Sequence, residues 1–309
     1  MSFDFSAVSD QTGRLAIVTG ANTGLGFETT RYFALKGMQV VMACRSEERA
    51  RAAMAEIKAE IPSARLSILP LDLSDLASVR AFATRFRQQH QSLDLLINNA
   101  GIMWTPYARS VDGFEGQMAA NYFGHFLLTS LMLDLMPDRP ESRVVTLSSI
   151  AHKQPLRRIR FEDLHWEQGY NKYQAYAQTK LSCLMFALEL QRRLQDSGSR
   201  VLSLAAHPGV SQTELVRTLK PWQVLLMRYS IGPLLFHPPR LAALPTVMAA
   251  LQPEVEGGDY FGPQGWREMK GAPGKAYVSR CARDEGAAKR LWEVSEELTG
   301  ASYFGGGAR

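Results

Sequence analysis

The sequence predicts a doubly wound α/β fold, in which a single parallel sheet carries helices on both of its faces. Three observations support this prediction. Short apolar runs without polar alternation, such as Leu15-Ala16-Ile17-Val18, are typical of strands that are buried on both faces. Charged amphipathic stretches of helical length separate these runs. Glycine or polar residues follow several runs, at the positions where ligands bind in open α/β sheets.

The strands and helices can be placed in order along the chain. The expected strands are residues 15–18, 39–44, 66–71, 93–97, 143–147 and 201–205. The first expected helix ends near residue 36, and the later ones cover residues 47–60, 75–90, 112–136 and 173–195. A terminal helix that contains Trp292 and Leu298 is expected to pack on the rest of the protein.

The first predicted strand leads into the glycine-rich turn GANTGLG at residues 20–26, which opens a helix. Glycines let the backbone approach a pyrophosphate closely, and the free N–H groups and the dipole of the helix face the anion. The glycine spacing differs from the commoner G-x-G-x-x-G pattern, and an ordinary loop is the alternative. The flanking strand and helix favour a cofactor-binding turn.

The second predicted strand ends in Cys44-Arg45 and carries no acidic residue there. An acidic side chain at this point would bind the ribose 2′-hydroxyl of NAD(H) and repel a 2′-phosphate. A guanidinium can instead pair with that phosphate. The sequence therefore favours NADP(H) over NAD(H), and the alternative is that Arg45 is only a solvated surface charge.

Tyr176 and Lys180 are four residues apart in a predicted helix, so their side chains share one face. A cation beside a phenol favours the phenolate and lowers its pKa from about 10. The pair can then give and take a proton near neutral pH. The alternative is an amphipathic helix with an incidental pair. Tyr170 and Tyr173 have no lysine four residues later.

The composition is ordinary for a globular protein of 309 residues, with 46% hydrophobic and 21% charged residues. The net charge is +5, but the basic residues are scattered, so no nucleic-acid partner is expected. The isolated cysteines Cys44, Cys183 and Cys281 fit a reducing compartment and form no metal-binding pattern. No signal peptide or membrane-spanning segment is expected, and the expected location is cytoplasmic.

Six motifs in order resemble the short-chain dehydrogenase/reductase family over about residues 14–213. They are the turn from Thr19 to Gly26, Asn98-Asn99-Ala100-Gly101, Asn121, Ser149, Tyr176-x-x-x-Lys180 and Pro208-Gly209. Within the family, the chain looks most like retinol dehydrogenases and WW-domain oxidoreductase-like proteins. The motifs that suggest this branch are ANTG at 21–24, ACR at 43–45 and NYFGHF at 121–126.

The resemblance implies one Rossmann-fold domain over residues 1–309. The residues from about 14 to 213 would bind the cofactor and carry out catalysis. The residues from about 214 to 309 would form a substrate cap and a C-terminal helix. The apolar part of that cap, from about residue 213 to 236, has plain core packing as its alternative. Family members often pair through the helices that bear Asn121 and Tyr176, so a homodimer is possible.

The resemblance also implies a role for each catalytic residue. Tyr176 would be the general acid and base, and Lys180 would lower its pKa and hold the nicotinamide ribose. Ser149 would donate a hydrogen bond to the substrate oxygen. Strand alternation sends the adjacent Ser148 to the opposite side, and the resemblance favours Ser149, with Ser148 as the alternative. Asn121 would hold a water that links Lys180 to solvent.

Further residues would contact the cofactor by the same resemblance. Asp72 and Leu73 would meet the adenine, and Asn99, Ala100 and Gly101 would flank the adenosine side. Pro208, Gly209, Val210 and Thr213 would border the nicotinamide. The complete expected cofactor set is Gly20, Asn22, Thr23, Gly24, Leu25, Gly26, Arg45, Asp72, Leu73, Asn99, Ala100, Gly101, Tyr176, Lys180, Pro208, Gly209, Val210 and Thr213, with no metal ligands.

The expected activity is an NADP(H)-dependent interconversion of an alcohol and a carbonyl group on an apolar small molecule, such as a retinoid, steroid or lipid. One alternative is reduction of a carbon–carbon double bond, as in protochlorophyllide reductases. The other is a non-catalytic NADP(H)-sensing scaffold. A scaffold is expected to lack part of the set Ser149, Tyr176 and Lys180, and all three residues are present.

Overall fold

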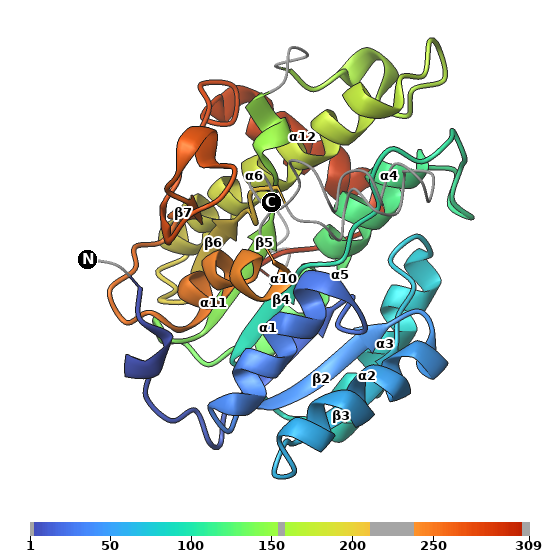
Figure 1. The fold of residues 1–309 in the computed structure, drawn as a ribbon. Helices are drawn as coiled ribbons and strands as arrows, with labels where there is room; N and C mark the ends of the chain where they lie inside the picture. The colour runs from blue at the N-terminus through green and yellow to red at the C-terminus, as the bar shows by residue number, and fades with distance from the viewer. Residues whose placement is uncertain (1–2, 154–157, 211–237, 305–309) are drawn as a thin grey trace, which may run out of the picture.

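The protein is described by a computed structural model that covers residues 3–153, 158–210 and 238–304. Eight strands form one sheet in the order β3-β2-β1-β4-β5-β6-β7-β8 (Figure 1). Neighbouring strands are parallel except for the antiparallel pair β7 and β8. The strands are β1 (Leu15–Thr19), β2 (Gln39–Cys44), β3 (Leu66–Pro70), β4 (Leu95–Asn98), β5 (Arg143–Leu147), β6 (Leu202–Ala206), β7 (Tyr260–Pro263) and β8 (Pro273–Lys275). The predicted doubly wound sheet is confirmed.

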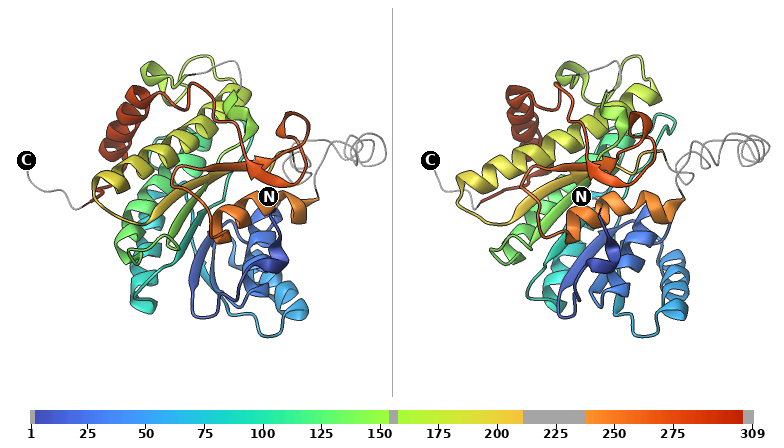
Figure 2. Two further views of the ribbon diagram at one scale, coloured as in Figure 1. Left: turned by 90° about the vertical axis from the view of Figure 1, so that its left-hand side faces the viewer. Right: turned by 60° about the vertical axis from the view of Figure 1, so that its left-hand side comes forward.

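Helices cover both faces of the sheet, and Figure 2 shows the two helical layers with the sheet between them. One layer contains α1, α2, α10 and α11, and the other contains α3, α4, α5 and α6, with α12 packed outside α6. The helices are α1 (Gly24–Leu35), α2 (Glu47–Glu60), α3 (Leu76–Gln89), α4 (Gly116–Met118), α5 (Gly124–Met132), α6 (Lys172–Asp196), α10 (Pro239–Ala242), α11 (Leu244–Leu251) and α12 (Glu285–Thr299).

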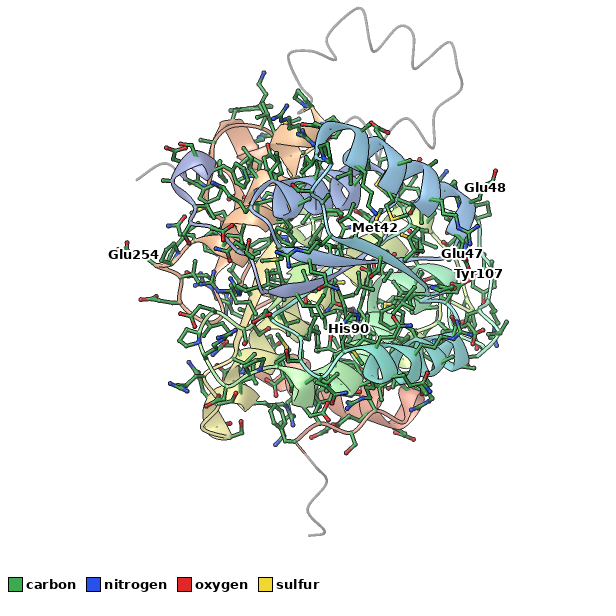
Figure 3. The ribbon with its side chains drawn as sticks, turned by 90° about the horizontal axis from the view of Figure 1, so that it is seen from below. Met42, Glu47, Glu48, His90, Tyr107 and Glu254 are labelled. Carbon is green, nitrogen blue, oxygen red and sulfur yellow. The ribbon has the colours of Figure 1, made fainter. Side chains whose placement is uncertain are left out.

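Each face of the sheet has its own hydrophobic core, which explains why the central strands are apolar throughout. In β1, Leu15 and Ile17 belong to one core, and Ala16 and Val18 belong to the other. Successive side chains of a strand point to opposite faces, so a strand covered on both sides needs apolar residues at every position. Figure 3 shows the fully buried Met42 of β2 inside the molecule and the exposed Glu47 and Glu48 at its surface.

Strand register brings the carboxyl ends of four strands together at one edge of the sheet. Thr19 of β1 is paired with Ala43 of β2, and Asn98 of β4 is paired with Thr146 of β5. The residues that follow these strands therefore lie side by side, although more than a hundred residues separate the first from the last. This edge is where the sequence motifs converge.

The prediction of one continuous helix over residues 112–136 is wrong. Asp112 accepts a hydrogen bond from the backbone N–H of Leu76 (3.0 Å) and so caps α3 instead of starting its own helix. The helix begins at Gly116, where the carboxylate of Glu115 accepts from the N–H of Met118 (2.8 Å). A π-helical segment, Ala119–Phe123, then interrupts the α-helical geometry before α5.

The helices and strands between residues 239 and 275 were not predicted from the sequence. α11 is buried from Pro245 to Leu251 and is apolar on nearly all sides, so it lacks the polar face that marks a surface helix. β7 and β8 contain glycine and proline, which are poor strand signals. The predicted terminal helix is confirmed as α12, where Trp292 stacks on Phe186 of α6 with ring centroids 5.8 Å apart.

Across the residues that the structure describes, no helix is both long and apolar enough to cross a membrane.

Candidate active site

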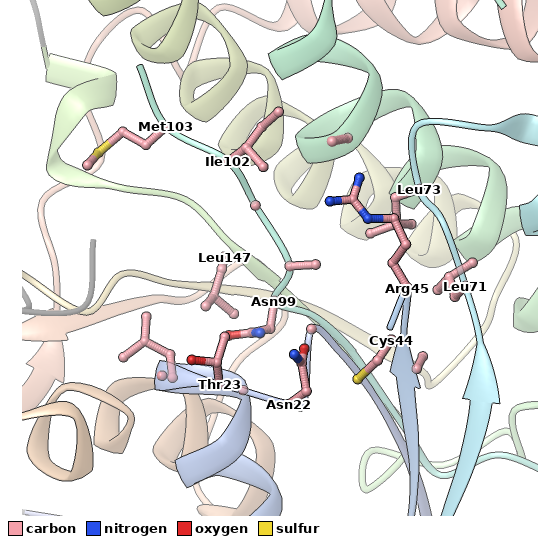
Figure 4. Close-up of a pocket in the computed structure, with 18 of the residues that line it drawn as sticks. Asn22, Thr23, Cys44, Arg45, Leu71, Leu73, Asn99, Ile102, Met103 and Leu147 are labelled. Carbon is pink, nitrogen blue, oxygen red and sulfur yellow. The ribbon is translucent and has the colours of Figure 1, made fainter. Parts of the chain in front are cut away.

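A cavity of about 780 Å³ opens at the carboxyl ends of β1, β2, β4 and β5. This volume suits a drug-sized or cofactor-sized ligand. Figure 4 shows Asn22, Thr23 and Asn99 on one wall and Arg45, Leu71 and Leu73 on another. The sequence-predicted residues that line the cavity are Gly20, Asn22, Thr23, Gly24, Leu25, Gly26, Arg45, Asp72, Leu73, Asn99, Ala100, Gly101, Tyr176, Lys180 and Pro208.

The remaining predicted residues lie near the cavity without being part of its described lining. Asn121 and Ser149 are buried beside it, and Gly209 and Val210 follow Pro208. The backbone N–H of Val210 donates to the carbonyl of Met269 (2.9 Å). Thr213 and the predicted substrate-capping segment up to residue 236 lie outside the described residues.

The glycine turn forms a cradle of bare backbone. Gly20 and Gly24 have φ angles of 65° and 57°, which side-chain-bearing residues rarely adopt. A Cβ atom on Gly26 would lie 2.4 Å from the carbonyl oxygen of Gly20, so only glycine fits there. Thr23 makes no side-chain cap at the start of α1. The first N–H groups of that helix therefore face the cavity as donors for an anion.

The end of β2 combines a buried thiol with exposed guanidinium groups. Cys44 is buried, and burial raises the pKa of its thiol to about 11, so the side chain is neutral. Nη1 of Arg45 lies 3.7 Å from Oδ2 of Asp72. Sequence reasoning missed Arg49, which lies one turn into α2 and also lines the cavity. The sequence feature that could have identified Arg49 is its spacing of four residues from Arg45.

Tyr176 and Lys180 project from α6 into the inner end of the cavity. Tyr176 is 4% exposed and Lys180 is 5% exposed. Nζ of Lys180 lies 5.8 Å from the centroid of the Tyr176 ring and donates to the carbonyl of Leu147 (3.0 Å). The helix is long and well capped, since Asn171 accepts from the N–H groups of Tyr173 and Gln174. The predicted common face of the two side chains is therefore present.

The two serines after β5 differ in what their hydroxyl groups contact. Ser148 lines the cavity, but its Oγ donates to the carbonyl of Lys180 (2.7 Å). Oγ of Ser149 accepts from the N–H of Ala151 (3.2 Å). The hydroxyl proton of Ser148 is thus committed to α6, whereas Ser149 uses only an acceptor lone pair in this contact.

Asn121 lies in the π-helical segment and holds the loop that follows β4. Its Oδ1 accepts from the N–H of Ile102 (2.7 Å), and its Nδ2 donates to the carbonyl of the same residue (2.9 Å). Nδ2 also donates to Oγ1 of Thr179 (3.1 Å), the residue before Lys180. Asn121 therefore joins the loop after β4 to the helix that bears the Tyr–Lys pair.

A partly buried network around His207 was not anticipated from the sequence. Nε2 of His207 lies 3.2 Å from Oε2 of Glu268, and Nζ of Lys153 lies 2.5 Å from the same oxygen. The N–H of Gly209 donates to Nδ1 of His207 (3.2 Å), so Nε2 carries the imidazole proton and donates to Glu268. The network ties three loops that are far apart in sequence.

Glu268 is the centre of this network. Burial alone raises the pKa of its carboxyl group, but the hydrogen bonds from His207, Lys153 and the N–H of Tyr277 outweigh burial and lower the pKa to about 2. Its backbone has a φ of 59°, an uncommon conformation for a side-chain-bearing residue. The contacts of the carboxylate hold the residue in this conformation.

We expect the Glu268 network to weaken in acid. The folded-state pKa lies below the ordinary value of 4.5, so its stabilisation is complete above about pH 4.5 and disappears as the pH falls towards 2. The stabilisation that is lost corresponds to about 2 kcal/mol in the free energy of unfolding, after allowance for solvent screening. The measurement is the free energy of unfolding against pH for the wild type, Glu268→Gln and the exposed control Glu254→Gln. Parallel curves for the wild type and Glu268→Gln would contradict this expectation.

Comparisons with known proteins agree with the geometry of the cavity. Residues 14–160 match the family described as short chain dehydrogenase. The chain is 40% identical to retinol dehydrogenase 13 of Mus musculus over 300 residues, which covers 95% of this chain and 86% of that protein. It is 42% identical to polyprenol dehydrogenase of Mus musculus over 303 residues, which covers 96% of this chain and 86% of that protein. The solved structure of an uncharacterized protein from Mycobacterium Paratuberculosis has a TM-score of 0.81 and 38% identity, and the match covers 98% of this chain and 99% of that one.

Proposed function

Because the chain belongs to the short-chain dehydrogenase/reductase family, in its retinol dehydrogenase-like branch, we propose that it is an NADP(H)-dependent oxidoreductase that interconverts an alcohol and a carbonyl group on an apolar small molecule. The observation that carries the proposal is the position of Tyr176 and Lys180. Both residues line the inner end of the same cavity whose outer end contains the glycine turn and Arg45. A proton donor and a cofactor cradle thus line the same open cavity.

The residues of the cavity fit a nicotinamide dinucleotide. The bare backbone at Gly20 and Gly26 leaves room for a pyrophosphate, and Lys180 can hold a ribose hydroxyl through its ammonium group. Such a cofactor, when bound, supplies or accepts the hydride. What remains for the protein is to position the reacting groups and to manage the proton.

Tyr176 is the proposed general acid during carbonyl reduction and the general base during alcohol oxidation. Its phenol gives a proton to the carbonyl oxygen as negative charge develops there. Ser149 is the proposed second donor to that oxygen, because its hydroxyl proton is not used in the contact with Ala151. Ser148 is the less suitable donor because its proton is held by the carbonyl of Lys180.

Lys180 and Asn121 are the proposed route by which the proton of Tyr176 is replaced. Oδ1 of Asn121 and Nζ of Lys180 both lie close to Gly101, since a Cβ atom there would be 3.3 Å from the first and 3.6 Å from the second. A water held by Asn121 could therefore reach Lys180 and connect it with solvent.

The preference for NADP(H) rests on the charge around the end of β2. Arg45 and Arg49 line the cavity, and an acidic residue is missing from the end of β2 itself. The ion pair between Arg45 and Asp72 is long and exposed, with 69% of the Arg45 side chain accessible. Such surface pairs contribute little, so Arg45 can turn to a 2′-phosphate at small cost.

An apolar substrate is proposed from the other wall of the cavity and from the relatives. The cavity that Tyr176 lines is also lined by Ile102, Met103, Leu147, Pro208 and Pro239. Apolar walls with few polar groups favour ligands of the same character. The similar proteins are named for retinol and polyprenol, which are both apolar alcohols. We therefore propose a retinoid-, steroid- or lipid-like alcohol or carbonyl compound.

A screen of the purified protein with NADPH against ketones, aldehydes and enones tests the proposal. We expect oxidation of NADPH with aldehydes or ketones that carry an apolar chain, and the product to be an alcohol. A saturated carbonyl product from an enone would instead favour double-bond reduction. NADPH binding without turnover of any of these compounds would favour the sensing scaffold.

A second copy of the chain is also proposed as a partner, and α12 limits where it can bind. Trp292 of α12 packs on Phe186 of α6, and Arg193 of α6 lies over the Trp292 ring at 4.4 Å. A homodimer through this face of α6 would have to displace α12. Sedimentation of the full chain distinguishes a monomer from a dimer.

A further inference from the structure

His125 is a fully enclosed histidine that lies between the cofactor turns and Asn121. It is on α5, four residues after Asn121, and only 2% of it is exposed. Its Nε2 lies 2.9 Å from Oγ1 of Thr19, the last residue of β1. Its Nδ1 lies 3.0 Å from the backbone carbonyl oxygen of Asn121. The imidazole therefore bridges two parts of the site that belong to different elements.

The acceptor at Nδ1 decides which tautomer of the neutral imidazole is present. The carbonyl oxygen of Asn121 is an acceptor, so Nδ1 of His125 must carry the proton. Nε2 of the neutral ring then has a lone pair. The hydroxyl of Thr19 can donate to it at 2.9 Å, and its other acceptor, the carbonyl oxygen of Ile97, is farther away at 3.2 Å. The two lone pairs of Thr19 Oγ1 accept from the N–H groups of Asn99 and Ala100, both at 2.9 Å. Thr19 Oγ1 thus contacts His125, Asn99, Ala100 and the carbonyl of Ile97.

This chain of hydrogen bonds reaches both ends of the candidate active site. Thr19 directly precedes Gly20, and its hydroxyl anchors the turn that contains Asn99 and Ala100. Asn121 holds Ile102 through both of its side-chain polar atoms. The turn after β4 is thus held at its start through Thr19 and at its end through Asn121, and His125 connects these two anchors.

We propose that His125 is a positioning residue, which as the neutral Nδ1–H tautomer sets the distance between the cofactor turns and Asn121. The inference rests on the proposed function, because it assigns these turns to the cofactor and Asn121 to proton supply. His125 touches neither substrate nor cofactor in this role. It acts through Thr19 and Asn121.

The surroundings of His125 keep it in this neutral form. Burial, together with the nearby charge of Lys180, lowers the pKa of His125 to about 4. Protonation would place a second N–H against Thr19 Oγ1, whose lone pairs are already occupied. Cys183 also donates to the carbonyl of Asn121 (3.3 Å), so the loss of His125 leaves that oxygen partly satisfied. Variants of His125 are therefore reasonable candidates for folding.

Three substitutions separate the two contacts. His125→Phe removes both and keeps an aromatic ring. The amide nitrogen of His125→Asn can replace Nδ1 and keep the bond to Asn121, and the longer His125→Gln can reach Thr19.

We expect His125→Phe to lower kcat/KM by about ten- to a hundredfold, since misplacement by about 1 Å is known to cost that much. We expect His125→Gln to retain NADPH affinity and His125→Asn to retain kcat. His90→Phe, at the end of α3, is the control for loss of a histidine.

The deciding measurements are the NADPH dissociation constant, kcat, the melting temperature and the ¹⁵N NMR spectrum of histidine-labelled protein. The proposal expects a protonated Nδ1 and an unprotonated Nε2 on His125 at neutral pH. A protonated Nε2 would overturn it, and so would a fall in melting temperature with unchanged kcat and NADPH affinity in His125→Phe. The NMR result does not depend on turnover, so it decides the tautomer even if no tested compound is a substrate.

Discussion

Replacement of Tyr176 by phenylalanine is expected to lower turnover by about two to four orders of magnitude, the usual contribution of general acid catalysis. The substitution removes one hydroxyl group from a residue that is 4% exposed and lines the inner end of the cavity. The ring is retained, so packing against α6 and the loops around it should change little. NADPH should bind as in the wild type, because the glycine turn and Arg45 are untouched.

Tyr173→Phe is the matched control for this experiment. Tyr173 is on the same helix, three residues earlier, but it is 54% exposed and has no lysine four residues later. We expect turnover within about twofold of the wild type for this variant, as for most surface substitutions. The measurements are kcat and the NADPH dissociation constant for both variants. Turnover of Tyr176→Phe at the wild-type rate would show that another group supplies the proton.

Cofactor selectivity is the second large effect that we expect. A hydrogen bond to a charged group contributes about 1.5–3 kcal/mol, which corresponds to roughly ten- to a hundredfold in kcat/KM for NADPH over NADH. Arg45→Ala should reduce this preference by weakening NADPH, since NADH has no 2′-phosphate. Arg49→Ala should act in the same direction, because Arg49 lines the same end of the cavity.

Cys44→Asp should go further and reverse the preference. Cys44 is the last residue of β2 and lines the cavity, so a carboxylate there would repel a 2′-phosphate and accept a hydrogen bond from a free 2′-hydroxyl. Backbone N–H groups of Ala21 and Asn22 face the Cys44 side chain and could also stabilise the new carboxylate.

Arg51→Ala is the control for the charge changes. Arg51 is also on α2, but it is paired with Glu47 (2.8 Å), and its side chain is 70% exposed. The measurement is kcat/KM for NADPH and NADH in the wild type and the four variants. Equal use of both cofactors by the wild type, or an unchanged ratio in Arg45→Ala, would mean that cofactor choice is set elsewhere.

The sequence alone was sufficient for six of the eight strands, the glycine turn and the Tyr–Lys pair. These features depend on local patterns. Buried parallel strands are apolar at every position, a cofactor turn lies between a strand and a helix, and residues four apart on a helix share a face. Tyr176 and Lys180 could be placed together without knowledge of any distant contact, because both lie on α6.

Contacts between distant segments decided the rest of the site. Asp112 has the residue type of a helix start, but it caps α3, which lies 36 residues away in sequence. The strand alternation that was used to separate Ser148 from Ser149 ends with β5 at Leu147, and the contact with Lys180 sets the orientation of Ser148. No local pattern contains such partners.

Two buried histidines illustrate the same limit. His207 lies 3.2 Å from Glu268, and Lys153, which contacts the same carboxylate, is 115 residues from Glu268 in sequence. His125 was noticed only as part of a family motif, and its partner Thr19 is 106 residues away. A buried polar group must find hydrogen-bond partners, but the sequence does not specify which ones. The sequence determined which residue types reach the carboxyl edge of the sheet. The tertiary structure decided how their hydrogen bonds connect, because hydrogen bonds form only between side chains that packing brings within about 3 Å of each other.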